Sequence, residues 1–145
     1  MNPLAPLYRF AGHLRYLKDR NVGSRGEEFA HRYLRKQGYT VIARNWRPPQ
    51  GGGEIDLIAW DKNQETLVFI EVKSRLSGVW SAPERDVDGE KLNSLRKAAR
   101  DYLRRADAEE ATTRFDVITI TGQTIDHIRE AFPLLRPRPG CATQK

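Results

Sequence analysis

The amino-acid sequence predicts an α/β fold in which helices flank a mixed β-sheet. Three observations lead to this class. Periodic segments follow one another in the order helix, three strands, helix, strand. The polar residues 61–65 join two apolar runs of β type, as the turn of an antiparallel hairpin does. A long helical segment before the last strand allows the chain to return parallel to the hairpin.

The bulk properties indicate one domain outside the membrane. A chain of 145 residues buries about two-thirds of its unfolded surface as a single domain. No apolar run reaches membrane-spanning length, and the first residues lack the pattern of a signal peptide. Cys141 is the only cysteine, so no intramolecular disulfide can form. We therefore expect a cytoplasmic protein with no membrane partner.

Composition divides the chain into three parts. Residues 1–21 form a basic N-terminal appendage with apolar residues at helical spacing. Residues 22–133 contain all the stronger helix and strand patterns and are predicted to be the folded domain. Residues 134–145 are rich in proline and are predicted to be a flexible tail.

The first helix of the domain is predicted from its capping residues. Ser24 and Glu27 have the spacing of a capping box, and Gly38 is a natural stop. At 100° per residue, Glu27 lies at the edge of the apolar stripe, whereas Glu28 faces water. Glu27 has two interpretations. It is either a capping residue whose negative charge interacts favourably with the helix dipole, or an acid of a functional site. The stripe consists of Phe29, Ala30, Tyr33 and Leu34.

The strands are predicted from apolar runs and from the turns between them. A loop over 46–53 contains two prolines and three glycines, which forbid regular structure. A fifth, short strand over 125–128 is compatible with the pattern. The other predicted strands cover residues 39–45, 54–60, 66–73 and 114–120.

The second helix is predicted over residues 90–106. Its apolar residues fall in one narrow stripe that would pack on the sheet, and Lys91 flanks that stripe, from where it could lean towards the sheet. The stripe consists of Leu92, Leu95, Ala99, Tyr102, Leu103 and Ala106. The opposite face is basic and carries Lys97, Arg100 and Arg104.

Three charged residues of the hairpin are candidates for chemistry. Side chains alternate along a strand, so Glu71 and Lys73 point the same way, about 7 Å apart. Asp56 on the partner strand can reach the same patch. Two carboxylates and a lysine can hold a divalent cation and stabilise the charge of a phosphoryl transition state. An exposed cross-strand charge pair is the structural alternative for Glu71 and Lys73.

The spacing Asp56-x14-Glu71-Val72-Lys73 resembles the PD-(D/E)XK nuclease motif, although Gly53-Glu54-Ile55 precedes Asp56 where that motif has a proline. Five blocks along about residues 22–133 resemble the YraN-like family of uncharacterised bacterial proteins. The resemblance implies a restriction-endonuclease-like core of α-β-β-β-α-β order, which agrees with the element order above. The blocks are Gly23-x-x-Gly26-Glu27-x-x-Ala30, Gly53-Glu54-Ile55-Asp56-Leu57-Ile58, Phe69-Ile70-Glu71-Val72-Lys73, Arg114-Phe115-Asp116-Val117 and Ala131-Phe132.

The resemblance also implies an activity, that of a metal-dependent endonuclease acting on DNA. Asp56, Glu71 and the Val72 carbonyl would hold Mg²⁺ or Mn²⁺, with Lys73 on the scissile phosphate or the attacking water and Glu27 as a further acid. Structured or junction DNA is a substrate by analogy with junction resolvases, and two symmetric cuts would favour a homodimer. The alternatives are a non-catalytic nucleic-acid-binding accessory protein and a module that binds an acidic protein through its basic helix.

The net charge of +6, from 25 Lys and Arg against 19 Asp and Glu, favours a polyanionic partner. Trp46 is a candidate for stacking on an unpaired base beside the glycine loop, and a mobile solvated loop is the alternative. The candidates for phosphate contact are Arg44, Arg47, Lys91, Lys97, Arg100 and Arg104.

Two further acids have structural interpretations. Glu54 lies on the same strand face as Asp56, and we expect it to pair with Arg44 or Arg47 rather than to join a metal site. Asp116 lies in an apolar strand, where a buried carboxylate needs a partner, so we expect a core ion pair with an arginine. The three histidines have no metal-ligand spacing and receive no role.

Overall fold

The computed structural model describes residues 24–75 and 89–132 of the chain. The predicted N-terminal appendage and C-terminal tail lie outside these residues, as do residues 76–88 between the third strand and the second helix. The elements are α2 (Ser24–Lys36), β1 (Tyr39–Trp46), β2 (Ile55–Asp61), β3 (Thr66–Arg75), α3 (Gly89–Arg105), β4 (Thr113–Thr121) and β5 (Thr124–Phe132). Neither helix is long and apolar enough to cross a membrane.

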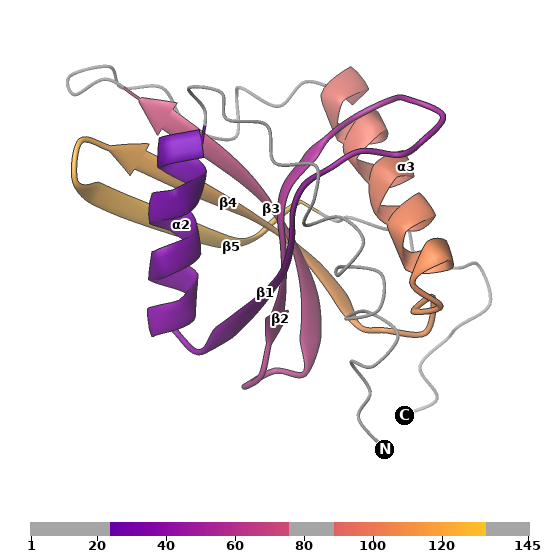
Figure 1. The fold of residues 1–145 in the computed structure, drawn as a ribbon, viewed down its shortest axis with the longest axis horizontal. Coiled ribbons are helices and arrows are strands. Elements are labelled where there is room, and N and C mark those ends of the chain that lie inside the picture. Colours follow the sequence, from indigo (N-terminus) through magenta and orange to yellow (C-terminus); the bar gives the residue numbers. More distant parts are fainter. Residues whose placement is uncertain (1–23, 76–88, 133–145) are drawn as a thin grey trace.

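The described strands form one mixed sheet in the order β1-β2-β3-β4-β5 (Figure 1). β2 and β3 form the predicted antiparallel hairpin, in which the Asp61 carboxylate accepts backbone hydrogen bonds from Asn63 and Gln64 in the turn. α3 then returns the chain, so that β4 pairs parallel with β3. The predicted α/β class with a mixed sheet is confirmed, and the fifth strand is longer than the sequence pattern indicated.

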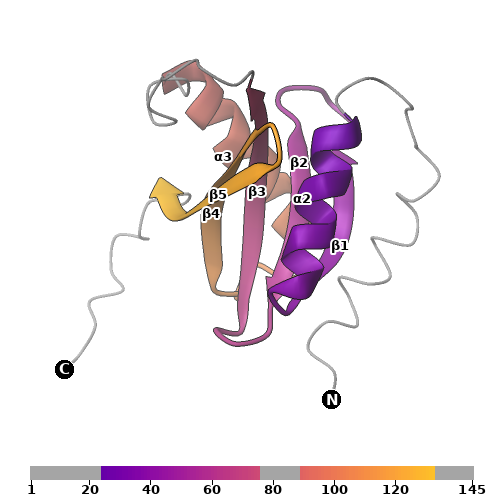
Figure 2. The same cartoon turned by 90° about the vertical axis from the view of Figure 1, so that its left-hand side faces the viewer.

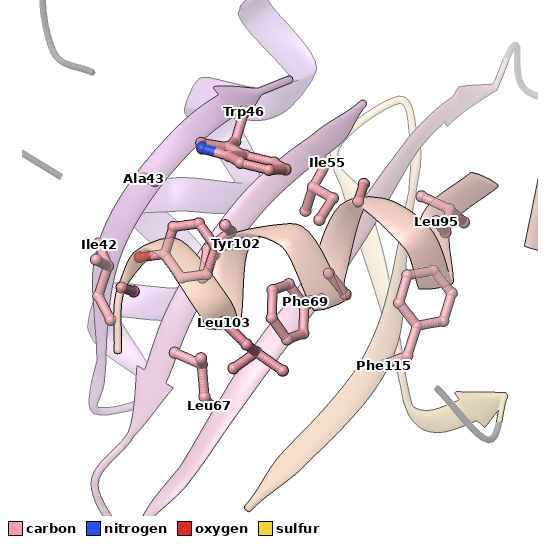
Figure 3. Packing of buried hydrophobic residues seen from close by; sticks show 14 of the residues in the cluster. Ile42, Ala43, Trp46, Ile55, Leu67, Phe69, Leu95, Tyr102, Leu103 and Phe115 are labelled. Carbon is pink, nitrogen blue, oxygen red and sulfur yellow. The ribbon is translucent and has the colours of Figure 1, made fainter. Parts of the chain in front are cut away.

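The two helices cover opposite faces of the sheet (Figure 2). On the α3 face, Tyr102 makes T-shaped contacts with Trp46 and Phe69, with ring centroids 5.5 and 5.9 Å apart (Figure 3). These rings are buried, and such edge-to-face contacts add about 0.5–1.5 kcal/mol each to area burial. The α3 face therefore holds the aromatic part of the core and fixes α3 on β1 and β3.

The core on the α2 face is mainly aliphatic, with Tyr39 as its buried aromatic residue. Ala30 and Leu34 are fully buried against strand residues. Phe29 was predicted to belong to the buried apolar stripe, but 38% of its surface is exposed. The first turn of α2 lies against the end of β3, since a Cβ built on Gly26 would meet the Ser74 hydroxyl. This approach sets the position of Glu27 relative to β3.

A buried polar network ties the hairpin turn to β4 and β5. The Arg114 guanidinium donates two hydrogen bonds to Asp116, at 2.8 and 2.9 Å, and a third to Asp61 at 3.1 Å. His127 Nε2 lies 2.7 Å from the Asp116 carboxylate and Tyr39 accepts a further bond from Arg114. The expected core ion pair of Asp116 is confirmed, and its partner is Arg114. The role of His127 in this network was missed.

Gly53 is required by close packing of the loop on α3. Its φ is +78°, and a Cβ at this position would lie 2.8 Å from the Ser94 carbonyl oxygen. Gly52 has a similar φ of +84° but open space around it. We predict that Gly53→Ala destabilises the protein by about 1–3 kcal/mol more than Gly52→Ala does. Urea unfolding of both variants measures the difference, and equal destabilisation would contradict the packing argument.

Candidate functional site

Asp56 and Glu71 lie on neighbouring strands at the same level of the sheet. Leu57 pairs with Ile70, and continuing this antiparallel register by one residue sets Asp56 opposite Glu71. Residues opposite one another have Cβ atoms about 4.5–5.5 Å apart. By strand alternation Glu71 and Lys73 lie on the α3 face. Asp56 is close enough to them to accept a hydrogen bond from the Val72 backbone and to be affected by the charge of Glu71. The structure thus brings together the three residues that the hairpin pattern predicted.

The Asp56 carboxylate is held in an acidic, largely buried place. Its Oδ2 accepts a hydrogen bond of 2.8 Å from the Val72 backbone N–H. Burial and then the charge of Glu71 raise the pKa of Asp56 well above its usual range, against the opposing effect of that hydrogen bond. A positive ion beside Asp56 and Glu71 would act in the opposite direction and favour the ionised carboxylate.

Glu71 is 7% exposed and forms an ion pair with Lys91 of α3. Lys91 lies in the first turns of the helix, and its ammonium donates to the Glu71 Oε1. The sequence-based expectation that Lys91 leans towards the sheet is therefore confirmed. A buried carboxylate needs a compensating charge, and in this structure the helix provides it.

Glu27 turns towards the same group of acids. Burial raises the pKa of the Glu27 carboxyl, and the charges of Glu54 and Glu71 act in the same direction, while a hydrogen bond with Asn45 opposes them. Capping alone does not account for this position. Sequence reasoning missed Asn45, whose φ of 52° is left-handed. Asparagine tolerates left-handed backbone better than most residues do. An asparagine near the end of a predicted strand was therefore the only sequence signal for this position.

Lys73 and Thr119 occupy neighbouring positions on β3 and β4, beside the acids. Lys73 is half-buried, and its side chain forms no ion pair or hydrogen bond with another residue of 24–75 or 89–132. Its partner in the parallel register is Thr119, which is 5% exposed and whose hydroxyl has no hydrogen-bond partner among the described residues. An ammonium and a hydroxyl next to the carboxylates can contact a phosphate or a water. Nothing in the sequence pattern singled out Thr119.

The segment expected to contact nucleic acid through Arg44, Trp46 and Arg47 is largely occupied by internal contacts. Trp46 is 1% exposed, so its interpretation as a base-stacking residue is wrong. Arg44 pairs with Glu28 at 2.8 Å, and the Glu28 side chain stays 47% exposed, as expected for a residue on the water-facing side of α2. Arg47 pairs with Glu54 at 2.8 Å, as expected for Glu54, while most of the Arg47 side chain stays exposed.

No group of three or more His, Cys, Asp or Glu side chains within the described ranges is arranged to hold a metal ion. The acids here each have another partner: Val72 N–H for Asp56, Lys91 for Glu71 and Asn45 for Glu27. The donor set nevertheless fits a hard cation. Mg²⁺ takes one or two carboxylates and keeps several waters, so Asp56 and Glu71 suffice. The Val72 carbonyl stays a predicted ligand.

The outer face of α3 is basic, as predicted. Lys97, Arg100 and Arg104 are exposed. Arg104 pairs with Asp101 at 2.6 Å, whereas Lys97 and Arg100 form no ion pair with another described residue. The helix that brings Lys91 to Glu71 therefore also presents positive charge to solvent.

Residues 26–120 match the family described as "Uncharacterised protein family UPF0102". A UPF0102 protein of Solibacter usitatus is 49% identical over 130 residues, which cover 87% of this chain and 97% of that protein. A UPF0102 protein of Geobacter metallireducens is 42% identical over 122 residues, or 81% and 97% of the two chains. One of Koribacter versatilis is 49% identical over 99 residues, or 68% and 67%. The chain therefore belongs to the UPF0102 family, the YraN family that its motifs indicated.

Proposed function

We propose that the protein is a metal-dependent endonuclease that hydrolyses phosphodiester bonds in DNA. One observation carries the proposal: Asp56 lies close to Glu71 at the end of the hairpin, and Lys73 lies on the same face as Glu71 without an ion-pair partner in the described ranges. A protein that only binds DNA has no need of two carboxylates facing each other. Their repulsion favours a cation between them, a place that the Lys91 ammonium takes on Glu71 in this structure and that we assign to a divalent metal in the active protein.

The residues divide the work of hydrolysis. Asp56 and Glu71 would hold Mg²⁺ or Mn²⁺, which supplies Lewis acidity and an activated water when bound. Lys73 would place its ammonium on the scissile phosphate or orient the attacking water, where fixed charge acts on the transition state. Glu27 is near enough to Asp56 to raise the pKa of its carboxyl further, and we assign it to orienting water around the cation.

A non-catalytic accessory protein that binds nucleic acid is the second candidate. It is favoured by the internal partners of the acids, above all by Lys91 on Glu71. In this case the carboxylates and lysines form a structural ion-pair network, and the basic face of α3 carries the binding. Cytoplasmic location, junction DNA as substrate and a homodimer that makes paired cuts complete the first proposal.

A panel of DNA substrates separates the two candidates. Duplex, single-stranded, flap and four-way-junction DNAs are incubated with Mg²⁺, Mn²⁺ or EDTA and the wild-type protein or Asp56→Asn. The endonuclease proposal expects cleavage that needs the metal and is abolished in Asp56→Asn. Binding of DNA without cleavage of any substrate would favour the accessory protein. No binding at low salt would exclude both.

The basic face of α3 is expected to touch the phosphate backbone. We predict that Lys97→Ala with Arg100→Ala weakens DNA binding and lowers the slope of log affinity against log salt by about 1 for each lysine or arginine that no longer neutralises a phosphate. Arg35→Ala with Lys36→Ala removes the same charge from α2, on the other side of the sheet, and is the control. Fluorescence anisotropy over a salt series gives the slopes. Equal slopes for both double variants would show that the α3 face is only solvated.

A further inference from the structure

We propose that Lys91 is an internal cation that competes with the divalent metal for Glu71 and that moves to a phosphate oxygen when nucleic acid binds. The inference rests on the proposed function and adds a regulatory step to the same site. It makes metal binding and nucleic-acid binding depend on each other.

The first support is the ion pair itself. The Glu71 side chain is only 9% exposed, and the ammonium of Lys91 donates to its Oε1. Removal of one partner from such a pair leaves a buried charge without compensation. An ammonium and a divalent cation that share one carboxylate repel each other, so a metal on Glu71 must displace Lys91 or bind more weakly beside it.

The second support is the position of Lys91 at the border of the site. Its side chain is 41% exposed, in contrast to that of Glu71, and it starts from the first turns of α3. A lysine carries its charge on a flexible four-carbon stem and binds phosphate as a point charge. The ammonium can therefore leave Glu71 for a phosphate in solvent without any movement of the helix.

Together, these two steps predict that metal binding and nucleic-acid binding are coupled. A phosphate that draws Lys91 away leaves Glu71 without its cation, and the metal then binds more tightly. Coupling between two ligands is reciprocal, so the metal must also strengthen nucleic-acid binding. A metal-free protein with Lys91 on Glu71 is thereby protected against holding the cation before its substrate arrives.

Calorimetry with MnCl₂ alone tests the competition. We expect Lys91→Met to bind Mn²⁺ about tenfold more tightly than wild type, within the usual range of site coupling. Lys91→Arg keeps a cation and should bind as wild type does, and Lys62→Met, which removes an exposed lysine from the hairpin turn, is the control. Without metal, Lys91→Met should melt at a lower temperature, and Mn²⁺ should raise its melting temperature more than that of wild type.

The outcomes separate this inference from the proposed function. Equal Mn²⁺ affinity in wild type and Lys91→Met would overturn the inference and leave the metal site intact. Failure of every variant to bind Mn²⁺ would overturn both. Lys91→Gln replaces Lys91→Met if the latter does not fold. A duplex with phosphorothioate linkages, which slow hydrolysis, should tighten Mn²⁺ binding in wild type but not in Lys91→Met, and no tightening in wild type would overturn the coupling.

Discussion

Lys73→Ala is expected to lower the rate of metal-dependent DNA cleavage by about 10²–10³ and to leave Mn²⁺ affinity nearly unchanged. A protonated lysine has no lone pair for a metal, so its contribution lies on the phosphate or the water. Lys73 is half-buried beside the acids and has no ion-pair partner within the described ranges, so its charge does not stabilise the fold through such a pair.

The measurement compares single-turnover cleavage rates and melting curves on the same preparations. Lys62→Ala is the matched control, because Lys62 is an exposed lysine in the turn of the same hairpin. It should cleave and melt as wild type does. A Lys73→Ala protein with a normal cleavage rate and an altered melting temperature would make Lys73 structural and remove it from the site.

Arg114→Met is expected to destabilise the fold by about 3–5 kcal/mol, the cost of leaving buried charges without their partner. Arg114 holds Asp61 and Asp116, and all three side chains are at most 3% exposed. Arg104→Met is the control, since its pair with Asp101 is exposed and such pairs contribute about 0–1 kcal/mol. Urea unfolding at neutral pH measures both, and a destabilisation by Arg114→Met as small as that of the control would contradict the account.

The pH dependence of this destabilisation has a definite sign. Burial alone would raise the pKa of Asp61 and of Asp116, but hydrogen bonds to the carboxylates outweigh burial. Arg114 and the turn backbone donate to Asp61. His127 and Arg114 donate to Asp116. The folded-state pKa values therefore lie below the unfolded value of about 3.9. The stabilisation is present above that pH and is lost as the pH falls through the folded pKa. The difference between wild type and Arg114→Met should thus shrink in acid.

The order of the elements and the hairpin were predictable because their signals are local. The turn over residues 61–65, the alternation along β3 and the capping residues of α2 each depend on neighbours in sequence. Alternation also placed Glu71 and Lys73 on one face, and the hairpin brought Asp56 across from Glu71. The predicted trio of the candidate site follows from these local rules.

The remaining parts of the site depend on contacts between distant segments. Trp46 follows an arginine and an asparagine in sequence, yet the α3 helix covers it and makes it a core residue. His127 lies in β5 and meets Asp116 only because β5 folds back on β4. The bond between Glu27 and Asn45 joins α2 to the end of β1. The hydrophobic periodicity of the sequence does not predict contacts between segments so far apart.

Calorimetric titration with Mn²⁺ of wild type and of Asp56→Asn with Glu71→Gln tests the metal site directly. We expect wild type to bind Mn²⁺ and the double variant not to bind it, because both carboxylate ligands are removed. Asp107→Asn with Glu109→Gln removes two exposed acids and should bind as wild type does. Identical Mn²⁺ binding by wild type and by Asp56→Asn with Glu71→Gln would contradict the proposed metal site, and with it the proposed endonuclease.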